Sequence, residues 1–401
     1  MAAHGWQFLY GPTFINFSDI VLSFNGSQGR RNYNDNYAGG FFNITIKNDS
    51  NQIANFPRGL SITIDTELGY SIADGVVTNI DFNDYPGNTG LSTATITCAD
   101  SLSQLGKFQL KDFTGYIATD TITQAEKTNN SFTGFDIPNI QGTYGRSNAS
   151  AAASYTGTVL NRLNLLVQTE KGLLFTGPFV DFKSRNQISN APMSIAMTRD
   201  TATPTSLKYQ DFKRVAAGDN FYNQVTVQPQ AVAEQQADNT TSQTAYGVSG
   251  YAISTVDSTT TQALGLAYWL ANMQGDPNTL RYEVTFTDVD NNAAAFANFF
   301  KDYKVDRIAM LSLEWQAQGQ STAVVNTIIE GFNYSGNPSQ TTVTVHLSPV
   351  EYYQYFILDD NIYGRLGGDG IVYDQPVITY DQSGWVYNDS NADDTASRLG
   401  W

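Results

Sequence analysis

The sequence predicts a mainly β protein with a few short helices, divided into several domains. Short segments in which Thr, Ser or Asn alternates with Ile or Val recur along the chain, spaced roughly ten residues apart near its start. Only a few segments show the apolar spacing of a helix. The 401 residues are enough for several domains, and a hydrophobic content of 41% is enough to give them cores.

The first part of the chain, residues 1–115, is predicted to be a β-barrel or sandwich. Its strands are expected in "FSDIVLSFNG", "FFNITIKND", "GLSITIDTE", "GVVTNIDFND" and "STATITCAD". Alternation in the second and third of these segments places their isoleucines on one face. Asp100 or Ser101 is expected to cap a short helical turn in "SLSQL".

Residues 116–210 are interpreted as a linker followed by an α+β domain. The linker, or exposed loop, is the stretch rich in small and polar residues near the start of this part. A helix is expected over residues 157–168, where Leu160, Leu163 and Leu166 recur at helical spacing. A hairpin-like pair of strands is expected in "GLLFTGPFVDFKSRN".

Residues 211–305 are predicted to form a second α+β domain with two helices. The first, "TTTQALGLAYWLANM", has a threonine cap and would place Leu264, Tyr268 and Ala271 on one face. The second, "NNAAAFANFFKDYKV", carries an aromatic stripe. The stripe could line a ligand groove, but a core between helix and sheet is the favoured interpretation. The stripe consists of Phe296, Phe299, Phe300 and Tyr303.

Strands return in residues 306–360, which are predicted to form a second barrel that could pair with earlier strands. Its segment 326–349 has the same pattern as residues 75–100. Each consists of a strand, a short loop rich in Gly, Asn or Pro, a strand of alternating Thr and aliphatic residues, and a segment that could turn helical. The pattern therefore predicts one structural unit present twice, with Cys98 and His346 near matching places.

The last part, residues 361–401, is polar with spaced aromatic residues and is interpreted as an arm that docks on another molecule. Its candidate assembly contacts are Trp385, Tyr387 and Trp401. The same tryptophans could instead stack on sugars. Binding of glycans by the isolated protein would favour that alternative.

The net charge of −16 and the pI of about 4.4 argue against a protein that grips nucleic acid by its phosphates. Solubility is the simplest explanation of the acidity. An acidic surface would also suit a conduit through which DNA must slide, since it would repel the DNA.

The sequence shows neither a signal peptide nor a membrane span, so we expect a protein that is made soluble inside a cell. The single cysteine cannot form an internal disulfide. The start "MAAHGWQFLYGP" lacks the pattern of a signal peptide, and no window approaches the ~18 apolar residues of a membrane span.

No known catalytic or cofactor motif is present, so neither an enzyme nor a cofactor is predicted. There is no nucleophile elbow, phosphate loop, HExxH or CxxC motif. With His4 next to the start, a histidine-based site would need His346, for which a structural role on the polar face of its strand is favoured. Cys98 is interpreted as a buried filler. The stretch after Asp288 begins like a calcium loop but has Phe299 at its twelfth position, so no metal site is predicted.

The order of these segments resembles the minor tail proteins of long-tailed bacteriophages, of the tail-tip or baseplate hub type. The features that carry the resemblance are "GGFFNITIKND", "RGLSITIDTE", "ATITCADSLSQL", "GLLFTGPFVDFKSRN", "ALGLAYWLANMQGDPNTLRYEVTFT", "IIEGFNYS" and "TVHLSP". The Ala/Ser-rich loop near residues 145–155 and the acidic tail match nothing in that pattern.

The resemblance implies a homotrimer below the tail tube, in a virion tail. Each chain would carry two tail-tube-like β-barrels, at residues 1–115 and 306–360, so that three chains present pseudo-sixfold symmetry. The partners would be other copies, the tail tube or distal tail proteins and other tail-tip proteins, with genomic DNA only in transit. The alternatives left open are a receptor- or carbohydrate-binding tail protein and a hydrolase of cell-wall glycan, which would need two carboxylates.

Overall fold

The computed structural model describes residues 6–353 with gaps, together with two short strands near the C-terminus. The gaps are residues 50, 86, 88, 114–118, 121–147, 150–154, 177–179, 190, 201, 217–220, 278–279, 317–320 and 338. Two compact units are distinguished, Met1–Val350 and Glu351–Trp401. In the second, β24 (Ile378–Tyr380) pairs antiparallel with β25 (Trp385–Tyr387).

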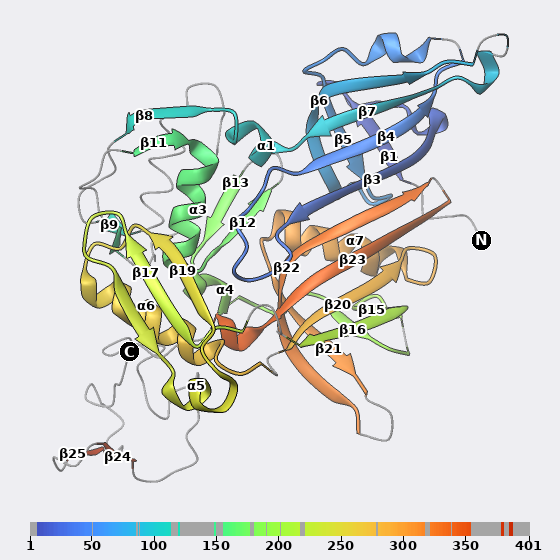
Figure 1. The fold of residues 1–401 in the computed structure, drawn as a ribbon. Helices are drawn as coiled ribbons and strands as arrows, with labels where there is room; N and C mark the ends of the chain where they lie inside the picture. The colour runs from blue at the N-terminus through green and yellow to red at the C-terminus, as the bar shows by residue number, and fades with distance from the viewer. Residues whose placement is uncertain are drawn as a thin grey trace. The chain divides into compact units, whose positions relative to one another are not determined.

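The first seven strands form one antiparallel part of a sheet in the order β3-β4-β7-β6-β5-β1-β2, here called the N-terminal half (Figure 1). Isoleucines point inward from alternate positions, as the sequence predicts. Ile44, Ile62, Ile64 and Ile96 are fully buried. The strands are β1 (Gln7–Tyr10), β2 (Ile15–Asn16), β3 (Val21–Gly29), β4 (Phe41–Lys47), β5 (Ser61–Asp65), β6 (Ser71–Asn83) and β7 (Thr93–Ala99).

The core of the N-terminal half lies between strands that are distant in the sheet order. The ring of Phe8 on β1 lies 5.2 Å from that of Phe24 on β3, and Phe17 packs edge-on against Phe8 at 5.9 Å. The sheet therefore curls so that β1 and β3 face each other across aromatic side chains. Short 3₁₀ turns at Ser18–Ile20, Gln52–Asn55 and Thr89–Leu91 and the helix α1 (Ser101–Leu105) connect the strands.

The C-terminal half of the same sheet contains strands from two separate stretches of the chain. β22 pairs with β21 and β23, β23 pairs with β20, and β20 pairs with β16, all antiparallel, while β14 lies parallel to β15 and β21. The strands are β14 (Ala196–Thr198), β15 (Ser206–Lys208), β16 (Asp211–Ala216), β20 (Leu280–Thr287), β21 (Met310–Trp315), β22 (Ala323–Asn337) and β23 (Gln340–Pro349).

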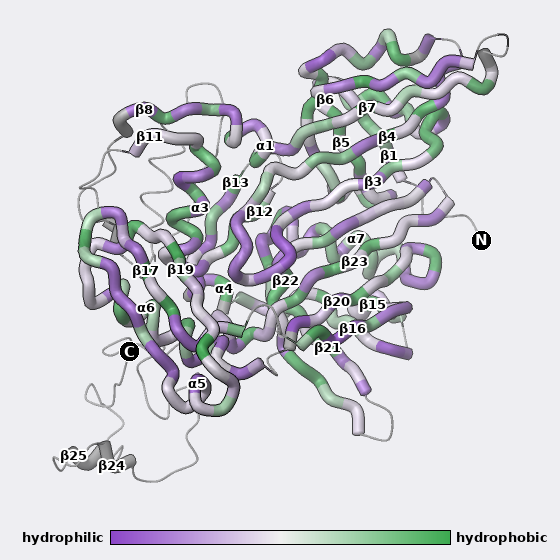
Figure 2. The backbone as a smooth tube through the Cα atoms, in the orientation of Figure 1, coloured by the Kyte–Doolittle hydropathy of each residue, from purple (hydrophilic) through white to green (hydrophobic). Residues whose placement is uncertain are grey.

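The two halves are joined edge to edge through the antiparallel pair β3–β22, so that a single 14-stranded sheet runs through both. Hydrophilic and hydrophobic positions alternate along these strands (Figure 2). The predicted mainly β fold with a few short helices is confirmed. Its division into barrels and domains stays a prediction, and the strands of residues 211–216 and 280–287 belong to the same half as those of residues 306–349.

The remaining elements are small sheets and helices. β8 (Gln109–Phe113) pairs with β11 (Tyr155–Thr158), and β12 (Leu173–Thr176) forms the expected hairpin with β13 (Val180–Lys183). A three-stranded sheet has the order β18-β17-β19. Its strands are β17 (Gln224–Pro229), β18 (Gln235–Asp238) and β19 (Gly250–Thr255), and the helices are α3 (Val159–Glu170), α4 (Arg185–Ser189), α5 (Thr240–Tyr246), α6 (Thr260–Met273) and α7 (Ala293–Phe300).

The predicted polar loop before α3 begins and ends at two strands that pair with each other. β8 and β11 bracket it, and within it β9 (Thr119–Asp120) pairs with β10 (Asn148–Ala149). The chain therefore leaves and re-enters beside the same strands, as an insertion does. The Ala/Ser-rich part of the loop falls largely outside the described residues.

The three long predicted helices are present, with one face assigned wrongly. The leucines of α3 and the aromatic stripe of α7 are buried, as predicted. In α6, Thr259 is the cap and Ala271 is buried, but the side chain of Tyr268 is 50% exposed. The buried face of α6 instead centres on Ala263 and Ala267, whose small side chains let the helix pack closely on the three-stranded sheet.

Candidate functional site

β22 is the strand at which both halves of the sheet meet. Its first residues pair with β21, its later residues pair with β3, and β23 lies along its other edge. The pair β3–β22 runs from Gly29↔Gly331 to Phe24↔Gly336. We call the contact at the Gly29 end of this pair the joint.

The predicted repeat is present as two long antiparallel hairpins, β6–β7 and β22–β23. In each, the register shifts at one extra residue of the first strand, Thr78 in β6 and Glu330 in β22. Each second strand is followed by a short helical turn, α1 after β7 and the 3₁₀ turn Val350–Tyr352 after β23. A bulge bends and twists its strand, so the two units share a shape as well as an order of elements.

The bulges show how the two hairpins correspond. Thr97 and Cys98 flank the register shift in β7, and His346 and Leu347 flank it in β23. Cys98 therefore matches Leu347, and both are buried on the core face. His346 matches Thr97, one position away from the predicted pairing with Cys98.

His346 and Cys98 have structural surroundings. His346 Nε2 lies 3.1 Å from Asn333 Nδ2, its Nδ1 lies 3.6 Å from Glu283 Oε1, and burial lowers its pKa. Burial raises the pKa of the Cys98 thiol, which keeps the sulfur protonated. Burial therefore favours the neutral form of both side chains.

At the joint, the bulged residue Glu330 forms a fully buried ion pair. Its Oε2 accepts a hydrogen bond of 2.7 Å from Arg30 Nε, and both side chains have no exposed surface. The backbone N–H of Arg30 also donates to the carbonyl of Glu330 at 3.0 Å. The bulge thus directs the carboxylate of Glu330, in the C-terminal half, toward the guanidinium of Arg30, which follows β3 of the N-terminal half.

Two glycines allow the strands to approach at this point. Gly29 has φ +81°, a conformation that favours glycine. A Cβ at Gly331 would lie 2.4 Å from the carbonyl oxygen of Gln28 and 2.7 Å from that of Arg30. Both contacts are with backbone, which cannot move aside as a flexible side chain can.

Two buried cations, each close to the ring of a tyrosine, lie between the joint and α3. The Arg30 guanidinium lies 5.1 Å from the ring centre of Tyr37, and Lys171 Nζ lies 5.1 Å from that of Tyr33. Burial, followed by the charges of Arg30 and Arg185, lowers the pKa of Lys171 well below its usual range. Periodicity and motifs in the sequence do not predict this group of side chains. An available signal was a charged residue beside a glycine inside an apolar strand, "IIEGF", which is typical of a bulge.

A second contact connects the same two halves. Lys304 lies in a turn of π-helix (Lys301–Val305) after α7, and its Nζ is 3.7 Å from Asp74 Oδ2 on β6. Asp100, the cap of α1 as predicted, lines the same small cavity. The cavity has a volume of about 10 Å³, which is too small for a sugar, so Asp74 and Asp100 do not form a glycosidase pair here.

Asp288 is a structural anchor rather than the start of a calcium loop. The Asp288 carboxylate accepts hydrogen bonds from Trp6 Nε1 at 3.0 Å and from the backbone N–H of Thr341 at 2.9 Å. Asn292 caps α7. Among the residues that the structure describes, no group of three or more His, Cys, Asp or Glu side chains could hold a metal ion.

One rim of the N-terminal half carries exposed apolar side chains. The β6–β7 hairpin extends past the end of β5, and the register places its tip at the same end as the β1–β2 turn. The side chains there are 46–61% exposed. We call this set the apolar rim; it consists of Phe14, Ile15, Phe82, Tyr85 and Leu91.

No described contact joins the predicted assembly residues to the apolar rim. Trp385 and Tyr387 belong to β25, whose side chains lie outside the described residues, and so does Trp401. In the described part of the chain, no helix is long and apolar enough to cross a bilayer.

No family model and no curated protein matches the sequence. The fold is similar to that of a tail protein from Neisseria meningitidis MC58, with a TM-score of 0.57, 10% identity, and 86% of this chain and 96% of that chain covered. It is also similar to the 43 kDa tail protein of prophage MuSo2 from Shewanella oneidensis, with a TM-score of 0.55, 12% identity, and 87% and 98% covered. The predicted resemblance to phage tail proteins is therefore confirmed at the level of the fold.

Proposed function

We propose that the chain is a structural subunit of a phage tail, a hub that joins the tail tube to the tail tip or baseplate. It would act as a homotrimer in which each chain supplies two similar units. The observation that supports this most is the pair of bulged hairpins, β6–β7 and β22–β23, in the two halves of one sheet. Three chains with two such units each would offer six similar positions to a sixfold partner.

The buried joint suits a subunit whose two halves must keep a fixed orientation. The ion pair Arg30–Glu330, the glycine contact Gly29–Gly331 and the pair Lys304–Asp74 all connect the two halves. A closed ring of six similar units requires a constant angle between the two units of each chain. A packed joint of this kind supplies that angle, and it leaves the apolar rim for contacts with other subunits.

The net charge of −16 supports the further proposal that the ring forms part of the DNA conduit. Few phosphate-neutralising contacts would form, so DNA would pass without being retained. Trp385, Tyr387 and Trp401 stay candidate contacts with neighbouring tail proteins. The protein would be located in the virion tail, and its action would be mechanical rather than enzymatic.

Light scattering of the purified full chain tests the oligomeric state. The proposal predicts the mass of three 44.0-kDa chains, and addition of the cognate tail-tube protein is expected to complete the trimer if the chain alone is smaller. A chain that stays monomeric with the tube protein present would contradict the proposal.

A further inference from the structure

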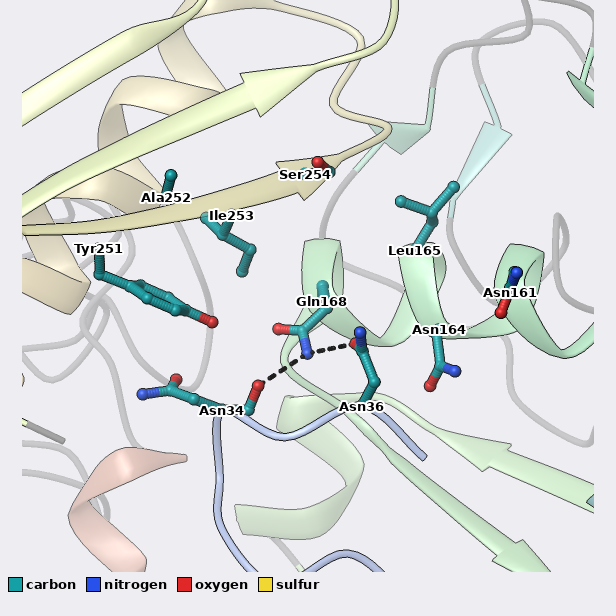
Figure 3. A pocket seen from close by; sticks show the side chains of 10 residues that line it. All are labelled: Asn34, Asn36, Asn161, Asn164, Leu165, Gln168, Tyr251, Ala252, Ile253 and Ser254. Carbon is teal, nitrogen blue, oxygen red and sulfur yellow. Dashed lines mark hydrogen bonds between the residues drawn. The ribbon is translucent and has the colours of Figure 1, made fainter. Parts of the chain in front are cut away.

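A polar cavity of about 470 Å³ lies between α3, the edge of β19 and the loop after β3 (Figure 3). Its volume falls within the roughly 300–1,000 Å³ of small-molecule sites. The described residues that line it include no acidic or basic side chain. Five of them are asparagine or glutamine, and these lie on α3 and on the loop after β3, opposite β19.

Part of this lining is fixed by hydrogen bonds within the wall. Gln168 Nε2 donates to the carbonyl of Asn34 and to Asn36 Oδ1, at 3.2 and 3.0 Å. The Asn164 amide forms a two-way pair with the backbone of Tyr37, at 2.8 and 2.9 Å. These contacts hold the wall in shape without a ligand.

Other groups face the cavity with no hydrogen bond to a described residue. They are the amide of Asn161, Nδ2 of Asn36 and the hydroxyl of Tyr251. The ring of Tyr251 stacks on Tyr222, with centroids 4.6 Å apart, which fixes its orientation. Burial raises the pKa of Tyr251 to about 12, so its hydroxyl remains a donor at neutral pH.

The edge of β19 adds main-chain groups to the same wall. The carbonyls of Ser249 and Thr255 accept from the β17 side, so the alternate residues Ala252 and Ser254 direct their N–H and C=O groups away from β17. On that outer side the N–H of Val256 donates to Thr169 Oγ1 on α3. The free edge is therefore short and ends at Val256.

We propose that this cavity binds a short neutral saccharide. Amides and hydroxyls both donate and accept hydrogen bonds, as sugar hydroxyls do. A charged ligand would find no counter-charge in the lining, and an apolar ligand would strip water from polar groups without replacing their hydrogen bonds. An extended peptide would need a longer row of free main-chain groups than β19 offers.

Two polar groups of the lining can be removed without the loss of a hydrogen bond within the wall, which allows a test that spares the fold. Full-length protein is mixed with neutral trisaccharides of glucose, galactose, mannose or N-acetylglucosamine, and binding is measured by saturation-transfer NMR. The double variant Asn161→Ala, Tyr251→Phe removes an exposed amide and a tyrosine hydroxyl, neither of which has a hydrogen bond to a described residue. Asn326→Ala, an exposed asparagine at the start of β22, is the matched control.

At least one trisaccharide is expected to bind at millimolar concentration or below. The double variant should weaken that binding at least about tenfold, since two hydrogen bonds are lost, while the control leaves it unchanged. An unchanged melting temperature shows that the double variant is folded. The proposal is overturned by absence of binding across the set, by equal binding to the double variant, or by a neutral tetra-alanine peptide that binds in place of the sugars. None of these outcomes affects assembly as a trimer, so the hub proposal stands or falls separately.

Discussion

Arg30 and Glu330 are 300 positions apart in the sequence and form a salt bridge of 2.7 Å with no exposed surface on either side chain. The pair lies where the two halves of the sheet meet. It exists because the bulge at Glu330 turns this residue toward β3. The joint is therefore a consequence of backbone geometry as well as charge.

Replacement of Glu330 by Gln should destabilise the protein strongly. The Arg30 cation would remain buried without its counter-charge, at a cost of about 3–5 kcal/mol in the free energy of unfolding. Urea unfolding followed by circular dichroism measures this. The double variant Arg30→Met, Glu330→Leu should recover most of the loss, because neither member of the ion pair is left buried without the other.

The matched control is Asp200→Asn, which removes the exposed ion pair with Arg199. This change should leave the urea midpoint of unfolding close to that of the parent protein, because water and salt screen an exposed pair. Equal effects of Glu330→Gln and Asp200→Asn on unfolding would contradict a structural joint.

Gly331→Ala should destabilise the joint by steric overlap. The added Cβ meets two backbone oxygens closer than 3 Å, and relief requires a shift of the strands, at about 1–3 kcal/mol. Gly265→Ala is the control, since a Cβ at this position of α6 meets nothing within 4 Å. It should stabilise by about 0.5–1 kcal/mol, because alanine is the better helix former. Thermal unfolding of both variants in one buffer compares them; a neutral Gly331→Ala would show that the strands are not closely packed.

Burial raises the pKa of Asp257 from 3.8 to about 6, and the neighbouring Glu170 adds to the shift. The folded state therefore holds this proton more tightly than the unfolded state does. The resulting stability is complete below pH 4 and is lost as the pH rises through 6. Asp257→Asn should remove this pH dependence and raise stability at pH 7.5 by about 2–3 kcal/mol.

Urea unfolding of the Asp257→Asn protein at several pH values between 4 and 7.5 is the measurement. Asp238 provides the comparison. It is an exposed carboxyl, and hydrogen bonds from Gln224 and Gln243 lower its pKa. Its Asn variant should lose stability at neutral pH relative to the parent, which is the opposite sign. A pH profile of Asp257→Asn that parallels the parent would disprove the assignment.

The apolar rim should matter for assembly and not for folding. Phe82→Ser combined with Leu91→Ser changes two side chains that are more than half exposed, so the free energy of unfolding should shift by no more than about 0.5 kcal/mol. The proposed trimer is expected to dissociate at concentrations where the parent protein stays assembled, as measured by light scattering. Val248→Ser changes a side chain that is 66% exposed outside the rim and should leave the mass unchanged. An intact trimer in the double variant would exclude the rim from the contacts that hold the trimer together.

Periodicity predicted the strands and helices well, because alternation and helical spacing are local signals. The buried isoleucines of β4 and β5 and the aromatic stripe of α7 follow directly from them. Tyr268 was assigned to the wrong face because the alanines of α6, which carry little hydrophobic signal, make the close contact with the sheet.

The joint could not be predicted, because it depends on which distant strands pair. Nothing local to Arg30 indicates a partner 300 residues away. The repeat was visible as a pattern, but the one-residue offset between Cys98 and His346 appears only when the bulges at Thr78 and Glu330 are counted. The polar cavity likewise combines α3, β19 and the loop after β3, which come from three separate stretches of sequence.

The central claim is that each chain supplies two similar units to one ring of a phage tail. Cryo-electron microscopy of tails that contain this protein tests it most directly. The account predicts three copies around the tail axis, with the β6–β7 and β22–β23 hairpins alternating at six positions. A position away from the axis, or a ring to which each chain contributes only one of the two hairpins, would contradict it.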